Sequence, residues 1–176
     1  TSFGFRARPG TSGTSQLLAL DVPTWLSIPT GYQGRLTFGV TPVLVDAGAL
    51  SLDEELGASR FGTTGVDLFG QAAGSFGQGL TGVELGLTEE IGVWRFDIGA
   101  TPLGFRIQTL TGGFSWNDQF GAVGLHLEGY RRALTESLLA WGGAEDIATG
   151  AVWGGVTKNG GRLDLGVTSD DLTWYL

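Results

Sequence analysis

In the stretch AVGLHLEGYRR, residues 122–132, apolar side chains at every second position oppose polar ones. Successive side chains of a β-strand point to opposite faces, so this period of two predicts an extended strand with two chemically different faces. The apolar face consists of Val123, Leu125 and Leu127. The polar face consists of His126, Glu128, Tyr130 and Arg132.

The same alternation returns in LTGVELGL (80–87), GVWRFDIG (92–99), RLTFGVTPVL (35–44) and RLDLGV (162–167). Turn-forming clusters such as EEIG, NDQFG and KNGG separate several of these segments. The pattern predicts an antiparallel all-β protein with about nine strands. We expect the strands to begin near Phe3, Gln16, Arg35, Leu80, Gly92, Arg106, Ala122, Ala151 and Arg162, with a shorter strand at Leu172.

Composition narrows the class of protein. The 176 residues include 32 Gly, 5 Pro, 1 His and no Cys, and the net charge is −8. The negative charge disfavours nucleic acid as a partner, and the lack of Cys excludes disulfides and thiolate metal sites. Since no run of eighteen apolar residues occurs, we expect no membrane-spanning helix. Residues 1–176 therefore read as one β domain or part of one, and the initial Thr1 indicates a processed or excised piece.

Two architectures fit the alternation: a soluble sandwich or barrel, and a transmembrane antiparallel up-and-down β-barrel. A membrane barrel has short turns on one side and long loops on the other. Here several turns are short, whereas the segments 46–79 and 134–150 are long. Aromatic residues near strand ends would suit the girdles at the membrane interfaces; they are Trp25, Trp94, Phe105, Trp116 and Trp153. We therefore favour the membrane barrel.

Three separated blocks carry a resemblance to a known family. They are RARPGTSGTSQLLALDVP at residues 6–23, DIGATPLGF at 97–105 and RRALTESLLAWGGAEDIATGAVWGGV at 131–156. In this order they resemble the C-terminal region of cellulose synthase operon protein C, the outer-membrane subunit family of cellulose synthesis. The resemblance implies a bacterial outer-membrane β-barrel of sixteen strands that exports a β-glucan, with the bilayer, the polymer and the inner-membrane cellulose synthase complex as partners.

The resemblance also implies periplasmic helical repeats upstream of the barrel, which this sequence lacks. About nine strands would make roughly half of a sixteen-stranded barrel. An eight-stranded barrel has an interior filled by its own side chains and could not pass a polymer. A non-conducting structural or adhesive barrel therefore remains the alternative to an export channel.

Polar residues on the expected inner face are the candidates for contact with the polymer. Together with loop residues, the substrate-path candidates are Arg95, Asp97, His126, Glu128, Tyr130, Arg131, Arg132 and Trp141. Arginine forks and carboxylates can bond sugar hydroxyls, and aromatic rings can stack on sugar rings. The alternative is that these charges merely pair across neighbouring strands.

Catalysis and cofactor binding find little support in the sequence. A catalytic His126 would need a nucleophile, and no Ser lies in a G-x-S-x-G turn. GQGLTG, residues 77–82, matches a dinucleotide fingerprint by letter, but a strand follows it where a helix is required. We therefore expect no enzyme activity, no cofactor and no metal.

The segment 131–155 interrupts the strand pattern. Thr135 is the expected N-cap of a short helix that Gly142 and Gly143 end. Its apolar face would consist of Leu134, Leu138, Leu139 and Trp141. Arg131 or Arg132 would pair with Glu145 or Asp146. The segment either lies in the lumen, with Trp141 against the polymer, or packs on the barrel wall.

Overall fold

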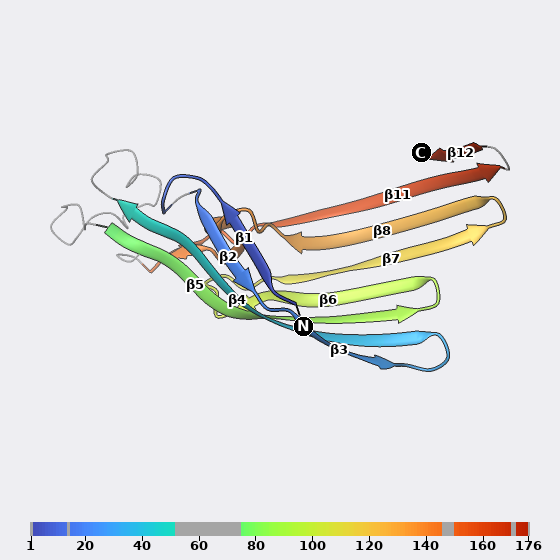
Figure 1. Ribbon diagram of the computed structural model, residues 1–176, viewed down its shortest axis with the longest axis horizontal. Helices are drawn as coiled ribbons and strands as arrows, with labels where there is room; N and C mark the ends of the chain where they lie inside the picture. Colours follow the sequence, from blue (N-terminus) through green and yellow to red (C-terminus); the bar gives the residue numbers. More distant parts are fainter. Residues whose placement is uncertain (1, 14, 52–74, 146–149, 170–171, 176) are drawn as a thin grey trace.

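The computed structural model describes residues 2–13, 15–51, 75–145, 150–169 and 172–175 (Figure 1). One antiparallel sheet dominates it. The strands of this sheet are β1 (Gly4–Arg8), β2 (Leu17–Asp21), β3 (Thr24–Pro29), β4 (Gly34–Ser51), β5 (Ser75–Ile91), β6 (Trp94–Leu103), β7 (Leu110–Phe120), β8 (Val123–Ala133), β11 (Thr157–Ser169) and β12 (Leu172–Tyr175). The short strands β9 (Ala144–Glu145) and β10 (Val152–Trp153) form a separate pair, and α2 (Leu138–Gly142) is a single helical turn.

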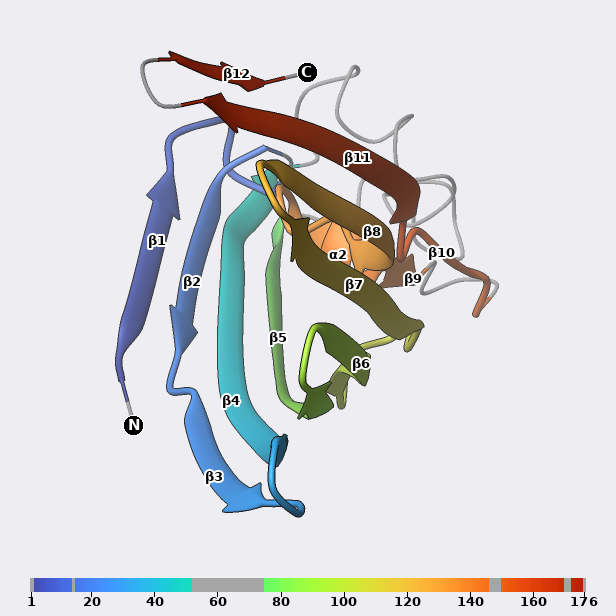
Figure 2. The same ribbon diagram turned by 90° about the vertical axis from the view of Figure 1, so that its right-hand side faces the viewer.

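Neighbours in sequence are neighbours in the sheet, in the order β1-β2-β4-β5-β6-β7-β8-β11-β12. Strand β2 pairs with Val43–Asp46 of β4, and β3 pairs with Arg35–Val40 of the same strand. Strands β2 and β3 therefore lie end to end beside β4. The break between them falls at Val22 and Pro23, where proline cannot donate a ladder hydrogen bond. The sheet curls into half of a barrel (Figure 2).

The strand predictions are confirmed for most of the sheet, with five corrections. The strand expected near Leu80 begins earlier, at Ser75. The segment Thr24–Pro29 is a strand that the sequence pattern did not predict. The strand expected near Arg106 begins at Leu110, and the one expected at Ala151 has only two residues. The strand expected at Arg162 begins earlier, at Thr157, because its pairing with β8 extends to Ala133.

Tight turns and long connections lie at opposite ends of the sheet (Figure 1). The β5–β6 and β7–β8 hairpins turn through Gly92 and Gly121, whose φ angles are 57° and 61°. Positive φ at this position matches the twist of the flanking strands and favours glycine. The C-terminal ends of β4, β6 and β8 all lie at the other end of the sheet. The expected long segment 46–79 is shorter than predicted, because β4 continues to Ser51 and β5 begins at Ser75. Residues 52–74 and 146–149 of the two expected long segments lie outside the described residues.

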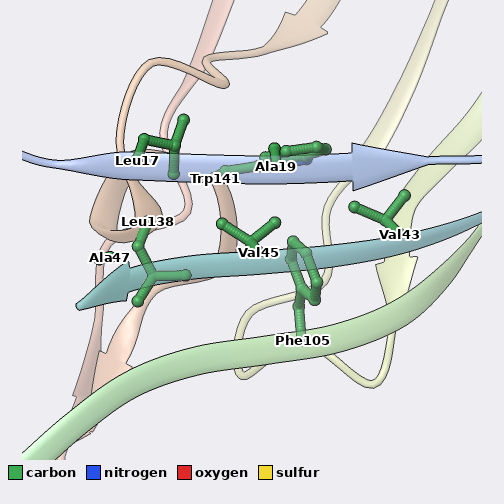
Figure 3. Close-up of a cluster of buried hydrophobic side chains, with 8 residues drawn as sticks. All are labelled: Leu17, Ala19, Val43, Val45, Ala47, Phe105, Leu138 and Trp141. Atoms are coloured by element: carbon green, nitrogen blue, oxygen red, sulfur yellow. The ribbon is translucent and has the colours of Figure 1, made fainter. Parts of the chain in front are cut away.

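A small apolar core lies at the end of the sheet that carries the long connections (Figure 3). Its buried members come from β2, β4, the β6–β7 connection and α2; they are Leu17, Ala19, Val43, Val45, Ala47, Phe105, Leu138 and Trp141. The connection after β8 reaches across the curl to β1. There Arg6 Nη1 donates to Thr135 Oγ1 at 3.0 Å, and Arg8 Nη1 donates to the Glu136 carbonyl oxygen at 2.9 Å. These contacts identify the face with Val43 and Val45 as the concave one.

Candidate functional site

The two faces of the sheet differ in chemistry along its whole width. Residues paired across antiparallel strands point to the same face, so the register assigns each side chain to a face. The convex face carries an apolar band over seven strands, which includes Leu26, Phe38, Leu87, Ile98, Phe96, Phe114, Trp116, Leu127 and Leu163. We call this band the outer face, and the concave side the inner face.

Polar residues form transverse rows on the inner face. One row crosses β4 to β11 and consists of Arg35, Glu90, Arg95, Ser115, Glu128 and Arg162. A parallel row consists of Asn117, His126 and Asp164. Both signs of charge alternate in these rows, which leaves the inner surface polar without a dominant charge. The register places the site candidates Arg95, Asp97, His126, Glu128, Tyr130 and Arg132 together on this inner face.

The pair Asp97 and Arg132 bridges two strands that are not neighbours. Arg132 Nη1 and Nη2 donate to the two Asp97 carboxylate oxygens at 2.6 and 2.9 Å. Gly113 lies between them on β7, and a Cβ built there would lie 2.9 Å from Arg132 Nη2. The missing side chain of Gly113 therefore opens the path for this fork-to-fork pair, which is a strong charge-assisted contact.

The expected pairing of Arg132 with Glu145 is wrong. Glu145 lies 3.9 Å from Arg106 instead, and Arg132 is directed toward Asp97. The other expected partner, Asp146, lies outside the described residues. The strand continues through Arg132 to Ala133, so the arginine belongs to the wall of the sheet rather than to the loop.

Five of the predicted site residues line one hollow of about 290 Å³ on this wall. Its lining consists of Arg95, Asp97, Phe114, Ser115, His126, Glu128 and Arg132. His126 Nε2 lies 4.0 Å from Glu128 Oε2, which is too long for a hydrogen bond. Among the described side chains, no hydrogen bond joins Ser115 to His126. The hollow therefore presents carboxylates and guanidinium groups suited to bonding hydroxyls.

Tyr130 and Arg131 are adjacent in β8 and point to opposite faces. A Cβ built on Gly160 would lie 2.6 Å from Tyr130 Oη, so the phenol ring covers that glycine on the inner face. Lys158 Nζ lies 5.9 Å from the centre of the same ring. Arg131 is on the outer face near the end of the strand, where its Nε donates to the Leu110 carbonyl oxygen at 3.0 Å. The structure thus does not bring Arg131 to the hollow.

Trp141 packs in the core at the base of α2. Its side chain is 4% exposed, its ring meets Phe105 edge-on at 5.6 Å, and the Arg6 guanidinium lies 5.1 Å from its centre. The helix is capped by Ser137, whose Oγ accepts from Ala140 N at 3.1 Å, so the expectation of Thr135 as N-cap is wrong. Thr135 instead accepts from Arg6. Of the two expectations for this segment, packing on the wall describes the environment of Trp141.

The five aromatic residues expected near strand ends do not share one face of the sheet. Trp94 and Trp116 lie on the outer face, with ring centres 5.9 Å apart. Phe105 is buried in the core, and Trp153 belongs to the separate pair of strands. Trp25 lies on the inner face, because it pairs with Gly39 while Leu26 pairs with Phe38 of the apolar band. The alternation in TWLSIP carried this information, but the sequence interpretation did not treat the segment as a strand.

Two kinds of structure are absent from the described part of the chain. None of its helices is long and apolar enough to span a membrane. Among the described residues, no group of three His, Asp or Glu side chains is placed to hold a metal ion.

Comparison with known proteins finds one family that matches most of the chain. The family model described as the cellulose synthase operon protein C C-terminus matches residues 15–176. The cellulose synthase operon protein C of Salmonella typhimurium is 35% identical over 89% of this chain and 13% of its own length. Cellulose synthase 2 operon protein C of Komagataeibacter xylinus is 35% identical over 87% of this chain and 12% of its own length.

A third relative, the cellulose synthase operon protein C of Pseudomonas fluorescens, is 33% identical over 97% of this chain. The chain spans about 13% of the length of that relative too. The match therefore covers almost all of this chain and a small part of each relative. The chain belongs to the family of cellulose synthase operon protein C C-terminal regions.

Proposed function

We propose that this chain forms part of a closed β-barrel in the bacterial outer membrane, through which a β-glucan, cellulose, leaves the periplasm. The continuous apolar band on the outer face is the observation that carries the proposal. Large apolar side chains on that face are exposed; Phe96, Ile98, Phe114 and Leu163 are examples. Exposure of this band to water would be unfavourable, whereas lipid chains would cover its apolar side chains without any further layer of protein.

Strand lengths support the same conclusion. Strands β6, β7 and β8 contain 10, 11 and 11 residues. A tilted strand crosses the hydrocarbon layer in about 9–11 residues. Short turns at one end and long connections at the other are also the arrangement of outer-membrane barrels.

Closure requires strands beyond those described. Strands β1 and β12 end the sheet, and each pairs on one side only within the described residues. Open edges of this kind invite further pairing, and a membrane leaves no water to satisfy them. We propose that additional strands complete a sixteen-stranded barrel, whose lumen is wide enough for a polymer. A periplasmic region of the intact protein would connect it to the inner-membrane cellulose synthase complex.

The inner face suits a neutral, hydroxyl-rich polymer. Its rows alternate Arg with Glu or Asp, and its charges pair within the wall, as in Asp97 with Arg132 and Arg162 with Asp164. Paired charges keep the surface hydrated without attracting ions of one sign strongly. We propose that the wall accompanies the polymer and performs no chemistry on it.

A non-conducting structural or adhesive barrel is the second candidate. The observation that favours it is the connection after β8, which crosses the concave side and is held to β1 through Arg6 and Arg8. Such a bridge narrows the space inside the curl. A barrel filled in this way would pass ions poorly and sugars not at all.

Reconstitution of the intact protein in planar lipid bilayers tests the proposal. An export channel should conduct ions, and cellohexaose should block the current reversibly. Cells that lack the protein should regain surface cellulose when it is returned. Incubation of the purified protein with cellohexaose should release no shorter sugars. Absence of conductance with a fully folded barrel would support the structural alternative instead.

A further inference from the structure

Trp25 is an exposed aromatic residue on a face where its neighbours are polar. Its side chain is 54% exposed, whereas that of Trp141 is 4% exposed. The indole leans over Gly39, since a Cβ built on that glycine would lie 3.3 Å from Trp25 Cδ1. One side of the ring therefore rests on bare backbone, and the ring remains open to the space enclosed by the sheet.

A row of glycines extends from Trp25 across the inner face. Gly39, Gly86 and Gly99 face one another in register on β4, β5 and β6. No heavy atom lies within 4 Å of a Cβ built on Gly86. The floor beside the indole is consequently flat backbone, which gives a planar ligand room to approach the ring.

Hydroxyl and carboxylate groups surround this floor. A hollow of about 130 Å³ is lined by Trp25, Thr37, Gly39, Thr41, Glu84, Gly86 and Thr88. Within the described part of the chain, the side chains of Thr41, Thr88 and Glu84 make no hydrogen bond or ion pair with another residue. Thr37 already bonds Ser27, with 2.8 Å between their hydroxyl oxygens. The hollow holds no basic residue, so a neutral ligand suits it better than an anion.

We infer that Trp25 is the stacking platform of a sugar-binding subsite that takes one pyranose ring of a β-linked glucan. All ring hydroxyls of β-glucose are equatorial, so both ring faces present C–H groups that pack on an indole while the rim offers hydroxyls. Thr41, Thr88 and Glu84 are placed to bond that rim. The inference rests on the proposed export function and names a contact for it.

The subsite continues toward the charged hollow described above. A second hollow of about 250 Å³ shares Glu84, Gly86 and Thr88 with the first and extends to Asp97 and Arg132. The wall thus offers an aromatic platform and then a paired carboxylate and guanidinium. A lipid-facing role for Trp25 does not fit this placement, because the apolar band lies on the opposite face.

Current block by cellohexaose in the intact, reconstituted protein tests the subsite. Trp25→Ala should weaken the apparent affinity by about fivefold, the low end of stacking on an aromatic side chain. Trp25→Phe, which keeps a ring, should stay within about twofold of wild type. Trp94→Ala is the matched control, since Trp94 is 42% exposed on the outer face, and it should leave the block unchanged.

Gly86→Val provides a second variant that leaves Trp25 in place. The backbone accepts a side chain at Gly86, but the isopropyl group would cover the floor and should weaken the block as well. If the wild-type pore is blocked and both Trp25→Ala and Gly86→Val keep its affinity for cellohexaose, the subsite is wrong. The proposed export function is not affected by that result. A wild-type pore that cellohexaose does not block overturns both. If Trp25→Ala does not insert into the bilayer, the affinity of Gly86→Val for cellohexaose tests the subsite: a weaker block supports it, and an unchanged block overturns it.

Discussion

Asp97 and Arg132 show how one glycine organises the inner wall. The two residues lie on β6 and β8, and the guanidinium crosses β7 where Gly113 has no side chain. The alternation of the sequence places both residues on the polar face, but it gives no signal that they meet. Cross-strand pairing by itself would have suggested only adjacent partners.

Arg132→Ala should lower the free energy of unfolding by about 1.5–3 kcal/mol, because hydrogen bonds to charged groups contribute that much and Asp97 would lose its partner. Urea unfolding of the intact protein in lipid vesicles measures the change. Arg162→Ala is the control, since Arg162 pairs with Asp164 on its own strand and is 66% exposed. Its expected loss is below about 1 kcal/mol. Equal losses of unfolding free energy in the two variants would show that the Asp97–Arg132 pair stabilises the sheet no more than an exposed ion pair does.

At the scale of elements, the sequence pattern predicted the strands more accurately than the connections between them. Period-two alternation is clear in β6 and β8, where the outer residues are apolar and the inner residues polar. It is lost at Val43–Val45 of β4, because the inner face there belongs to the apolar core. The row shared by β2 and β3 was less visible, because Pro23 divides it into short pieces. The face of Trp25 could have been read from TWLSIP only by treating those few residues as a strand.

The connection after β8 depended on contacts that a local pattern does not contain. Its helix begins after Ser137 rather than Thr135. The Thr135 hydroxyl instead accepts from Arg6, on a strand far away in sequence. Trp141 is buried for a similar reason: Phe105, Val45 and Leu17 come to it from three separate elements. Hydrophobic residues on one side of a predicted helix indicate burial, but they do not tell which strands provide the partners.

Trp141→Ala should lower the free energy of unfolding by about 3–5 kcal/mol, as for other large aromatic residues in a packed core. Leu139→Ala on the same helix should cost less, since Leu139 is only partly buried. Cellulose export per folded barrel should stay at the wild-type level in both variants. If export per folded barrel falls for Trp141→Ala but not for Leu139→Ala, the Trp141 ring contacts the polymer in a second conformation of the connection after β8.

At the scale of the whole molecule, the most informative property is the difference between its two faces. The core described here is small and lies at one end of the sheet, whereas the outer face exposes apolar side chains on nearly every strand. Burial of so few apolar side chains contributes little free energy to folding of the described sheet in water. Lipid outside and water with polymer inside would satisfy both faces at once.

Leu127→Arg provides the sharpest test of this assignment. Leu127 lies on the outer face between Trp116 and Leu163, and an Arg at the middle of the bilayer should cost about 2–4 kcal/mol of unfolding free energy. Gly124→Arg is the matched variant on the same strand, because Gly124 faces inward and a Cβ there meets only Gly166 O at 3.9 Å. It should cost clearly less, since its guanidinium would reach the hydrated interior. Urea titration in vesicles measures both, and equal costs would contradict the assignment of the outer face to lipid.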